Sequence, residues 1–199
     1  MLIVITREEN TEDEVAVLKS LFENGLQTLH VRKPFMSKTD LEKWLLNFSE
    51  MHHQKMMLHQ HHELCEIFKI KGVHLTEKQR STLENRKVYI EKFQKKGKMV
   101  STGFHTVAEL EKEGSIYDYC FLSPIFNSIS KENYVGKQFN INGLHQKIVA
   151  LGGIDSSKIT EVKKLGFSGV AVLGHIWKSK NAVKSYVQMK KKYEEVFKI

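Results

Sequence analysis

Two apolar runs in the C-terminal third of the chain show what kind of sheet it forms: IVALGG at residues 148–153 and GVAVLGHI at residues 169–176. Both runs are continuous, with no alternation of apolar and polar residues. Continuous apolar strands are typical of parallel sheets, which helices cover on their faces. Between the runs, Ile159, Val162 and Leu165 recur at helical spacing. The segment therefore predicts a strand–helix–strand unit.

The same alternation extends back to the N-terminus. A Thr11-x-x-Glu14 capping box predicts the start of a first helix, which Gly25 ends, and Ser37 predicts the cap of a second. The last helix is expected over residues 181–198. Strand-like runs occupy residues 2–6, 28–32, 55–59, 72–76, 98–102, part of 117–124, 148–153 and 169–176.

Eight strand-like runs alternating with helices predict a closed, small (β/α)8 TIM barrel, a single domain over residues 1–199. An open doubly wound sheet is the alternative. The first strand–helix turn has no GxGxxG fingerprint, and the glycines that end the last two strands are typical of barrel phosphate loops, so the barrel is favoured. Residues 140–147 are too few for a full helix, so some helices are expected to be shortened.

Composition excludes several classes of protein. The two cysteines are far apart in sequence, which excludes a disulfide scaffold, and the apolar runs are too short to cross a bilayer. The formal charge of +8 comes from scattered lysines that do not interleave with aromatic residues. We therefore expect a cytoplasmic protein that binds neither nucleic acid nor membrane.

Functional side chains of a parallel barrel lie at the C-terminal ends of its strands. Gly152 and Gly153, together with Gly174, predict a phosphate site, because backbone N–H groups next to glycine can approach an anion closely. The predicted strand ends carry no carboxylate, which suits an anionic ligand. Their other polar residues are His30, Arg32, Lys33, His59, Gln60, His74, Thr76, His105, Ser123 and His175.

The histidines of this ring raise the question of a zinc site, because imidazole is a preferred zinc ligand. No HxH pair occurs and no carboxylate accompanies them, so histidines that only form hydrogen bonds are favoured. His105 and His175 are candidate acid–base groups, since imidazole titrates near neutral pH.

Several of these segments together resemble the thiamin phosphate synthase and thiazole tautomerase family. They include TLHVRK at 28–33, GVHL at 72–75 and SPIFNSISK at 123–131, and the last is similar to the family's GPIFPTxTK loop. The resemblance covers residues 2 to about 193. It implies a barrel that joins hydroxymethylpyrimidine pyrophosphate to thiazole phosphate and releases pyrophosphate.

The resemblance also implies roles for residues. Ser128, Ser130 and Lys131 match the thiazole-phosphate loop, with Lys131 a candidate catalytic group, and Arg32 matches an arginine that contacts the pyrophosphate. The partners it implies are phosphorylated thiazole and pyrimidine molecules, and a homodimer is compatible with it. The candidate substrate-binding residues are His30, Arg32, Lys33, His59, Gln60, Ser128, Ser130, Gly152, Gly153 and Gly174.

The chain departs from the synthase pattern at the magnesium ligands. The family implies Mg²⁺, but both of its aspartate positions read glutamine, Gln60 and Gln79, and neutral glutamine is a poorer ligand for a hard cation. The tautomerase branch needs no pyrophosphate chemistry, yet its catalytic histidine reads Pro124 here. The sequence therefore leaves three functions open: a synthase, a tautomerase-like isomerase, or a non-catalytic binder of thiazole phosphate or thiamin phosphate.

Overall fold

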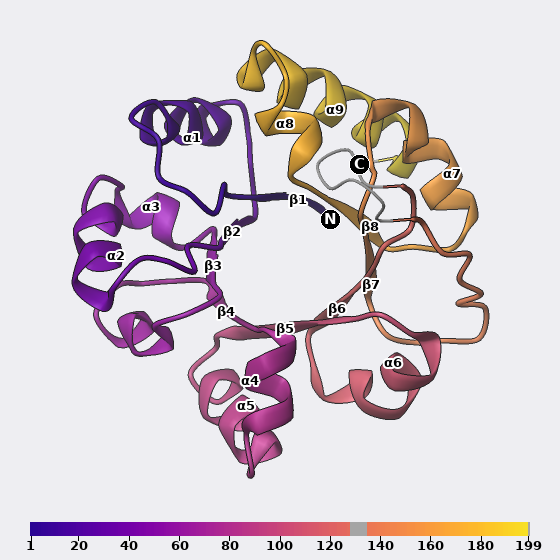
Figure 1. The fold of residues 1–199 in the computed structure, drawn as a ribbon, viewed down its shortest axis with the longest axis horizontal. Helices are drawn as coiled ribbons and strands as arrows, with labels where there is room; N and C mark the ends of the chain where they lie inside the picture. The colour runs from indigo at the N-terminus through magenta and orange to yellow at the C-terminus, as the bar shows by residue number, and fades with distance from the viewer. Residues whose placement is uncertain (128–134, 199) are drawn as a thin grey trace.

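The computed structural model describes residues 1–127 and 135–198, and its eight strands form one closed parallel barrel (Figure 1). Each strand pairs with the next along the chain, and β8 pairs with β1. The predicted (β/α)8 barrel is confirmed. The strands are β1 Leu2–Ile5, β2 Leu29–Val31, β3 Met56–Leu58, β4 Gly72–Leu75, β5 Met99–Phe104, β6 Tyr119–Leu122, β7 Ile148–Leu151 and β8 Gly169–Val172.

Helices surround the barrel on its outside (Figure 1). The α-helices are α1 Glu14–Glu23, α2 Lys38–Leu45, α3 Glu50–His53, α4 Glu77–Thr82, α5 Arg86–Gln94, α6 Val107–Glu113, α7 Ile159–Lys164, α8 Gly174–Trp177 and α9 Ala182–Phe197. Short 3₁₀ helices cover His62–Glu66, Gly114–Ile116 and Ser156–Lys158. The last helix, α9, contacts α1, α7 and α8 and so joins the two ends of the chain.

Helices are shortened where the sequence predicted it. A 3₁₀ turn replaces a full α-helix after β3, and the described residues between β6 and β7 contain no helix. The eighth strand is shorter than predicted, because it ends at Val172 and α8 begins at Gly174. The last three residues of the predicted run, Gly174 to Ile176, therefore belong with Trp177 to a helical turn at the mouth of the barrel. No helix in the described ranges is long and apolar enough to cross a membrane.

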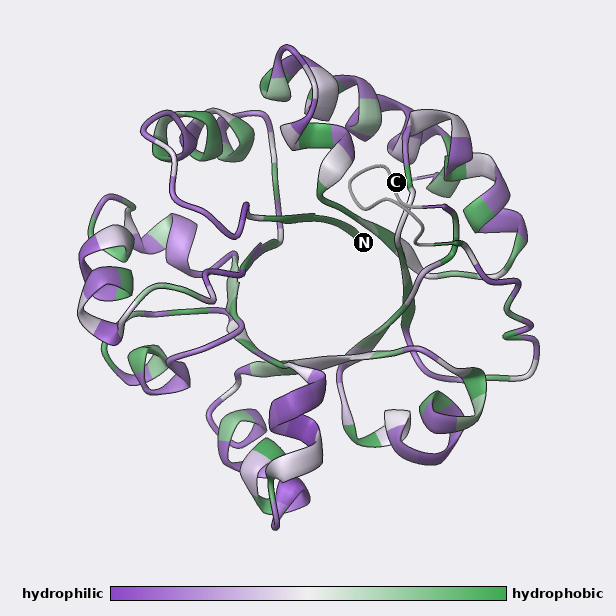
Figure 2. Cartoon of the chain, in the orientation of Figure 1, coloured by the Kyte–Doolittle hydropathy of each residue, from purple (hydrophilic) through white to green (hydrophobic). Residues whose placement is uncertain are grey.

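Alternation along the strands separates two apolar layers. Residues such as Val4, Leu29 and Val170 point outward into the large cluster between barrel and helices. Their neighbours along the strands point inward, because successive strand side chains face opposite sides of a sheet. The apolar residues buried in the lumen are Ile3, Ile5, Met57, Tyr119, Phe121, Val149 and Ala171. Figure 2 shows apolar residues concentrated on the strands and on the helix faces turned toward them.

A buried ion pair joins α1 to the loop after β2 and corrects two predictions. The Lys33 ammonium contacts the Glu14 carboxylate, and neither side chain is exposed. Glu14 is therefore not the reciprocal member of a capping box, and Asp13 is the N-cap of α1. Lys33 was predicted at the barrel mouth, but it lies under α1 and also donates to the Glu9 carbonyl oxygen at 2.8 Å. Lys33 lies beyond the end of β2, directly after Arg32, and its side chain points away from the barrel toward Glu14 of α1.

Removing one member of this pair is expected to destabilise the fold strongly. Lys33→Met leaves the Glu14 carboxylate buried without its cation, at a cost of about 3–5 kcal/mol. Urea unfolding of Lys33→Met measures this loss. In the double variant Lys33→Met/Glu14→Leu no charge remains buried, so we expect most of the stability to return. A double variant as unstable as Lys33→Met would show that the charge is not the cause.

Candidate active site

A cavity of about 370 Å³ opens at the C-terminal ends of the strands. Its wall combines apolar residues, including Ile5 and Phe121, with polar residues, including Thr76 and Ser123. An apolar cavity with a few converging polar groups is the usual form of a small-molecule site. The residues predicted from the sequence that line it are Arg32, His59, His105, Gly152, Gly153, Gly174 and His175.

The glycines after β7 form a tight turn against the loop after β6. Gly152 and Gly153 have φ angles of +101° and +66°. A Cβ atom on Gly153 would lie 2.2 Å from the Asn127 carbonyl oxygen. Phe126 N donates to the Gly152 carbonyl oxygen at 3.1 Å, which holds the two loops together. Only glycine fits this turn, so backbone rather than side chains forms this part of the cavity wall.

The turn after β8 completes this side of the cavity. Gly174 is the first residue of α8, and the first N–H groups of a helix have no partner within the helix. Gly153 and Gly174 both line the cavity, so backbone from two neighbouring loops faces the same space. Such an arrangement suits the oxygens of a phosphate group.

Arg32 supplies the guanidinium of the cavity. Its Nη1 atom contacts the Glu8 carboxylate, and both side chains are about one-third exposed. Its backbone N–H donates to Thr6 Oγ1 at 2.8 Å, which fixes the start of the loop. A guanidinium can bind two oxygens of a phosphate at once. An incoming anion would compete with Glu8 for Arg32.

A carboxylate lies in the cavity, contrary to the expectation of a mouth without acids. Glu77, at the start of α4, lines the cavity, and its carboxylate lies 3.7 Å from His105 Nε2. His105 Nδ1 lies 2.9 Å from the Ser123 carbonyl oxygen, which orients the ring. Glu77 lies two residues after the end of β4, so it was not among the residues expected at the strand ends. The imidazole and the carboxylate are close enough to interact electrostatically, but 3.7 Å is longer than a hydrogen bond.

His175 occupies the opposite side of the mouth, in α8. Burial lowers the pKa of its imidazole, and the carboxylate of Asp155 partly opposes that shift. His175 is therefore neutral at pH 7, with one nitrogen able to accept a proton. His105 and His175 both line the cavity, so both candidate acid–base groups reach its ligand.

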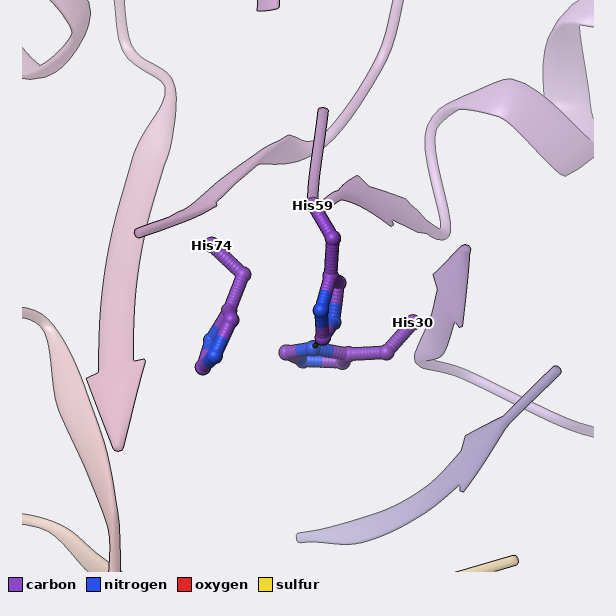
Figure 3. Close-up of side chains that lie close together, drawn as sticks. All are labelled: His30, His59 and His74. Carbon is purple, nitrogen blue, oxygen red and sulfur yellow. Dashed lines mark hydrogen bonds between the residues drawn. The ribbon is translucent and has the colours of Figure 1, made fainter. Parts of the chain in front are cut away.

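Three further histidines meet below this mouth. His30, His59 and His74 are buried, and their rings converge from neighbouring strands (Figure 3). His30 Nδ1 lies 2.9 Å from His59 Nε2, and the rings of His59 and His74 stack at 4.2 Å between centroids. Burial lowers the pKa of all three, that of His74 to about 3, so all are neutral.

Two interior hydroxyls orient these rings. The Tyr119 hydroxyl lies 2.5 Å from His30 Nε2, and Ser101 Oγ lies 2.9 Å from His74 Nδ1. Neither residue was predicted from the sequence, although alternation along YCFL and MVSTGF places both in the lumen. At this level β2, β4 and β5 therefore place polar side chains in the lumen, next to the apolar ring of Phe121.

The residues present do not fit the magnesium site that the family resemblance implies. Gln79 Oε1 accepts from the N–H and the hydroxyl of Thr76, both at 2.8 Å, and Nε2 donates to the His59 carbonyl oxygen. Gln79 is thus committed to capping α4 and does not line the cavity. Gln60 also lies outside its wall, and Gln60 Nε2 is buried without a partner among the described residues. Neither side chain supplies the charged oxygen that Mg²⁺ prefers.

The predicted residues Ser128, Ser130 and Lys131 fall in 128–134, outside the described residues. Their expected roles in binding the thiazole phosphate stay predictions. The described residues on either side of them border the glycine turn: Gly136 N donates to Asn127 Oδ1 at 2.9 Å, and Ile125 N donates to the Leu151 carbonyl oxygen at 3.0 Å.

Comparison with known proteins identifies close similarity to one family. The family model described as thiamine monophosphate synthase matches residues 1–176. A thiamine-phosphate synthase of Caldicellulosiruptor saccharolyticus is 26% identical over 179 residues, which cover 84% of this chain and 78% of the relative.

Solved structures agree with this similarity. A thiamine phosphate pyrophosphorylase from Bacteroides thetaiotaomicron shares 27% identity with a TM-score of 0.75, covering 97% of both chains. The one from Pyrococcus furiosus has a TM-score of 0.79 at 18% identity, covering 98% of this chain and 96% of its own, and supports the fold.

The glycine turn gives a matched test. Gly153→Ala is strained by its positive φ and also drives Cβ against the Asn127 carbonyl, whereas Gly97, at φ +70°, has open space around an added Cβ. Gly97→Ala should cost about 1–2 kcal/mol for backbone strain alone. We expect Gly153→Ala to lose more stability in urea and to weaken binding of inorganic phosphate measured by calorimetry. Equal losses in the two variants would contradict the close packing at Gly153.

The buried His74 predicts a loss of stability in acid. Its pKa falls from 6.5 to about 3 on folding, so between these values only the unfolded chain binds the proton. The free energy of unfolding should then decrease as pH falls below 6.5, by about 1.4 kcal/mol per pH unit for this group. Urea unfolding in chelator at pH 6 to 4.5 measures the slope. We expect His74→Gln to have a shallower slope, and identical slopes would rule out a neutral, buried His74.

Proposed function

The chain belongs to the thiamine monophosphate synthase family, and from this premise we propose that it joins hydroxymethylpyrimidine pyrophosphate to thiazole phosphate in the cavity at the barrel mouth. The observation that carries the proposal is the backbone cup formed by Gly152, Gly153 and Gly174. A phosphate bound there would place the attached thiazole against the apolar wall. The relatives named thiamine-phosphate synthase support the same reaction.

Arg32 is the proposed partner of the pyrophosphate. It lines the same cavity as the glycine cup, on the loop after β2, and its contact with Glu8 keeps the guanidinium oriented. In the reaction the thiazole nitrogen forms a bond to the pyrimidine methylene carbon, while that carbon loses the pyrophosphate oxygen. The leaving pyrophosphate takes the bonding electrons, and the positive charge of Arg32 stabilises it.

Magnesium has no place in this proposal, because Gln60 and Gln79 do not supply its carboxylates. In this proposal the positive charge for the leaving group comes from side chains. Arg32 lines the cavity, and the overall charge of +8 favours entry of anionic substrates. The family's thiazole-phosphate half is kept better in this chain than its pyrophosphate half.

A second candidate is a tautomerase-like isomerase of a phosphorylated thiazole. The contact between His105 and Glu77 favours it, because a shift of a proton needs an acid–base group and no metal. His175 on the other side of the cavity could return the proton. This reaction uses the same phosphate cup and releases no pyrophosphate.

An assay with purified protein separates the two reactions. Thiazole phosphate and the pyrimidine pyrophosphate are supplied together, and thiamin phosphate is measured by chromatography with EDTA and with millimolar Mg²⁺. We expect product in both conditions, with little acceleration by Mg²⁺. Turnover that depends strictly on Mg²⁺ would overturn the interpretation of Gln60 and Gln79. Binding of thiazole phosphate without product favours the isomerase or a binder.

Variants assign the roles of the cavity histidines in whichever reaction is found. His105→Gln should lower turnover about 100-fold if its imidazole transfers the proton, the lower end of the usual range for acid–base groups. His52→Gln, a substitution in α3 that does not line the cavity, is the matched control and should leave turnover unchanged. If thiazole phosphate does not bind to the protein, the proposed function is wrong.

A further inference from the structure

Three imidazole rings converge at the floor of the cavity (Figure 3). One ring nitrogen from each of His30, His59 and His74 lies within 4.8 Å of the other two. His59 and His74 line the cavity, and His30 lies beneath them, fully buried. The cluster is therefore enclosed by the barrel yet open on one side to whatever binds in the mouth.

The register of the sheet produces this convergence. His30 lies in β2 and His74 in β4, and His59 follows β3 directly. Leu58 is level with Val73 in the pairing of β3 with β4, so His59 is level with His74. Three adjacent strands thus send an imidazole into the lumen from neighbouring positions, and the closed backbone holds them there.

The hydrogen bonds of the cluster orient the rings as metal ligands are usually oriented. His30 Nε2 is paired with the Tyr119 hydroxyl and His74 Nδ1 with Ser101 Oγ. Histidines that bind metals nearly always hydrogen-bond through their other nitrogen, which fixes the tautomer. These bonds leave His74 Nε2 as the second nitrogen of its ring, and they leave His30 Nδ1 paired with His59 Nε2.

We propose that His30, His59 and His74 form a site for a transition-metal dication of the Zn²⁺ class, with its fourth coordination position open to the cavity. Neutral imidazoles suit Zn²⁺ and its neighbours and do not suit Mg²⁺, which prefers oxygen. The site thus differs in position and in ligand chemistry from the magnesium site that the family implies at Gln60 and Gln79.

The distances require only side-chain adjustment. Bonds of 2.0–2.1 Å in a tetrahedral site place ligand nitrogens about 3.3 Å apart. His30 Nδ1 and His59 Nε2 are now 2.9 Å apart, the length of a hydrogen bond, and the remaining separations reach at most 4.8 Å. Binding would replace that hydrogen bond and turn the His74 ring inward.

The fourth ligand is expected to be an anion. Three neutral imidazoles leave the dication with its full charge, and an unbalanced charge is costly to bury. Hydroxide or a phosphate oxygen of a ligand in the cavity would reduce that cost. Because His59 and His74 form part of the cavity wall, such an oxygen can reach the ion.

Metal binding is measured without any thiamine precursor, so its failure and the failure of the proposed function are separate results. The protein is first stripped with a chelator and dialysed. Zn²⁺ is then titrated in competition with a chromophoric chelator, and Co²⁺ is added to a second sample for its visible spectrum. We expect one equivalent of Zn²⁺ and a four-coordinate Co²⁺ spectrum. If the wild type shows neither stoichiometric Zn²⁺ binding nor a four-coordinate Co²⁺ spectrum, the proposal is wrong.

Variants identify the ligands. His74→Gln and His59→Gln should each weaken Zn²⁺ binding by about 100-fold or more, since even partners of the ligands contribute 10–100-fold. His105→Gln, in the same cavity but outside the cluster, is the control and should bind Zn²⁺ as the wild type does. If the cluster variants bind Zn²⁺ as tightly as this control, the site lies elsewhere and the proposal is wrong. If a variant does not fold, the Co²⁺ spectrum of the wild type tests the site instead. A four-coordinate spectrum supports the proposal, and its absence contradicts it.

Discussion

Closure of the sheet forces every second strand residue into a lumen that only side chains can fill. Ile3, Val149 and Ala171 fill it on one side with apolar contacts. On the other side β2, β4 and β5 contribute His30, His74 and Ser101 instead. A polar group in such a place is stable only when it finds a partner, because unpaired polar atoms are costly to bury. The hydrogen bonds among these residues therefore offset the cost of burying polar side chains in the lumen.

The two sides of the lumen explain how the cavity above them is divided. Apolar residues under the glycine turns give a rigid backbone wall, and Gly153 can approach the Asn127 carbonyl because it has no side chain. The glycine turns follow β7 and β8, whereas His105 follows β5 and Glu77 begins α4. His175 adjoins Gly174 in α8, so one candidate acid–base group lies beside the glycine turns and the other lies next to Glu77.

The sequence predicted the fold well because the relevant signals are local. Continuous apolar runs, glycines after β7 and β8, and the Ser37 cap each depend on a few consecutive residues, and the structure has them as predicted. The mouth was predicted less well, because position along a strand does not determine which way a loop residue points. Lys33 follows Arg32 directly, yet its side chain turns under α1 to Glu14. Glu77 was not among the residues predicted at the strand ends, because it enters the cavity from the start of α4.

The histidine cluster shows a further limit of sequence reasoning and why it arises. His30, His59 and His74 are separated by dozens of residues, so no motif connects them, and the sequence alone favoured simple hydrogen bonding. Only the pairing of β2, β3 and β4 brings them together in the lumen, with His59 level with His74 and His30 below them, level with Met57. The same chain has glutamine at both magnesium positions. The two family positions for magnesium carboxylates are thus glutamine, whereas three imidazole nitrogens gather at the floor of the cavity. A cation bound in the proposed site would be held by these imidazoles, and an anionic ligand in the cavity would be its remaining partner.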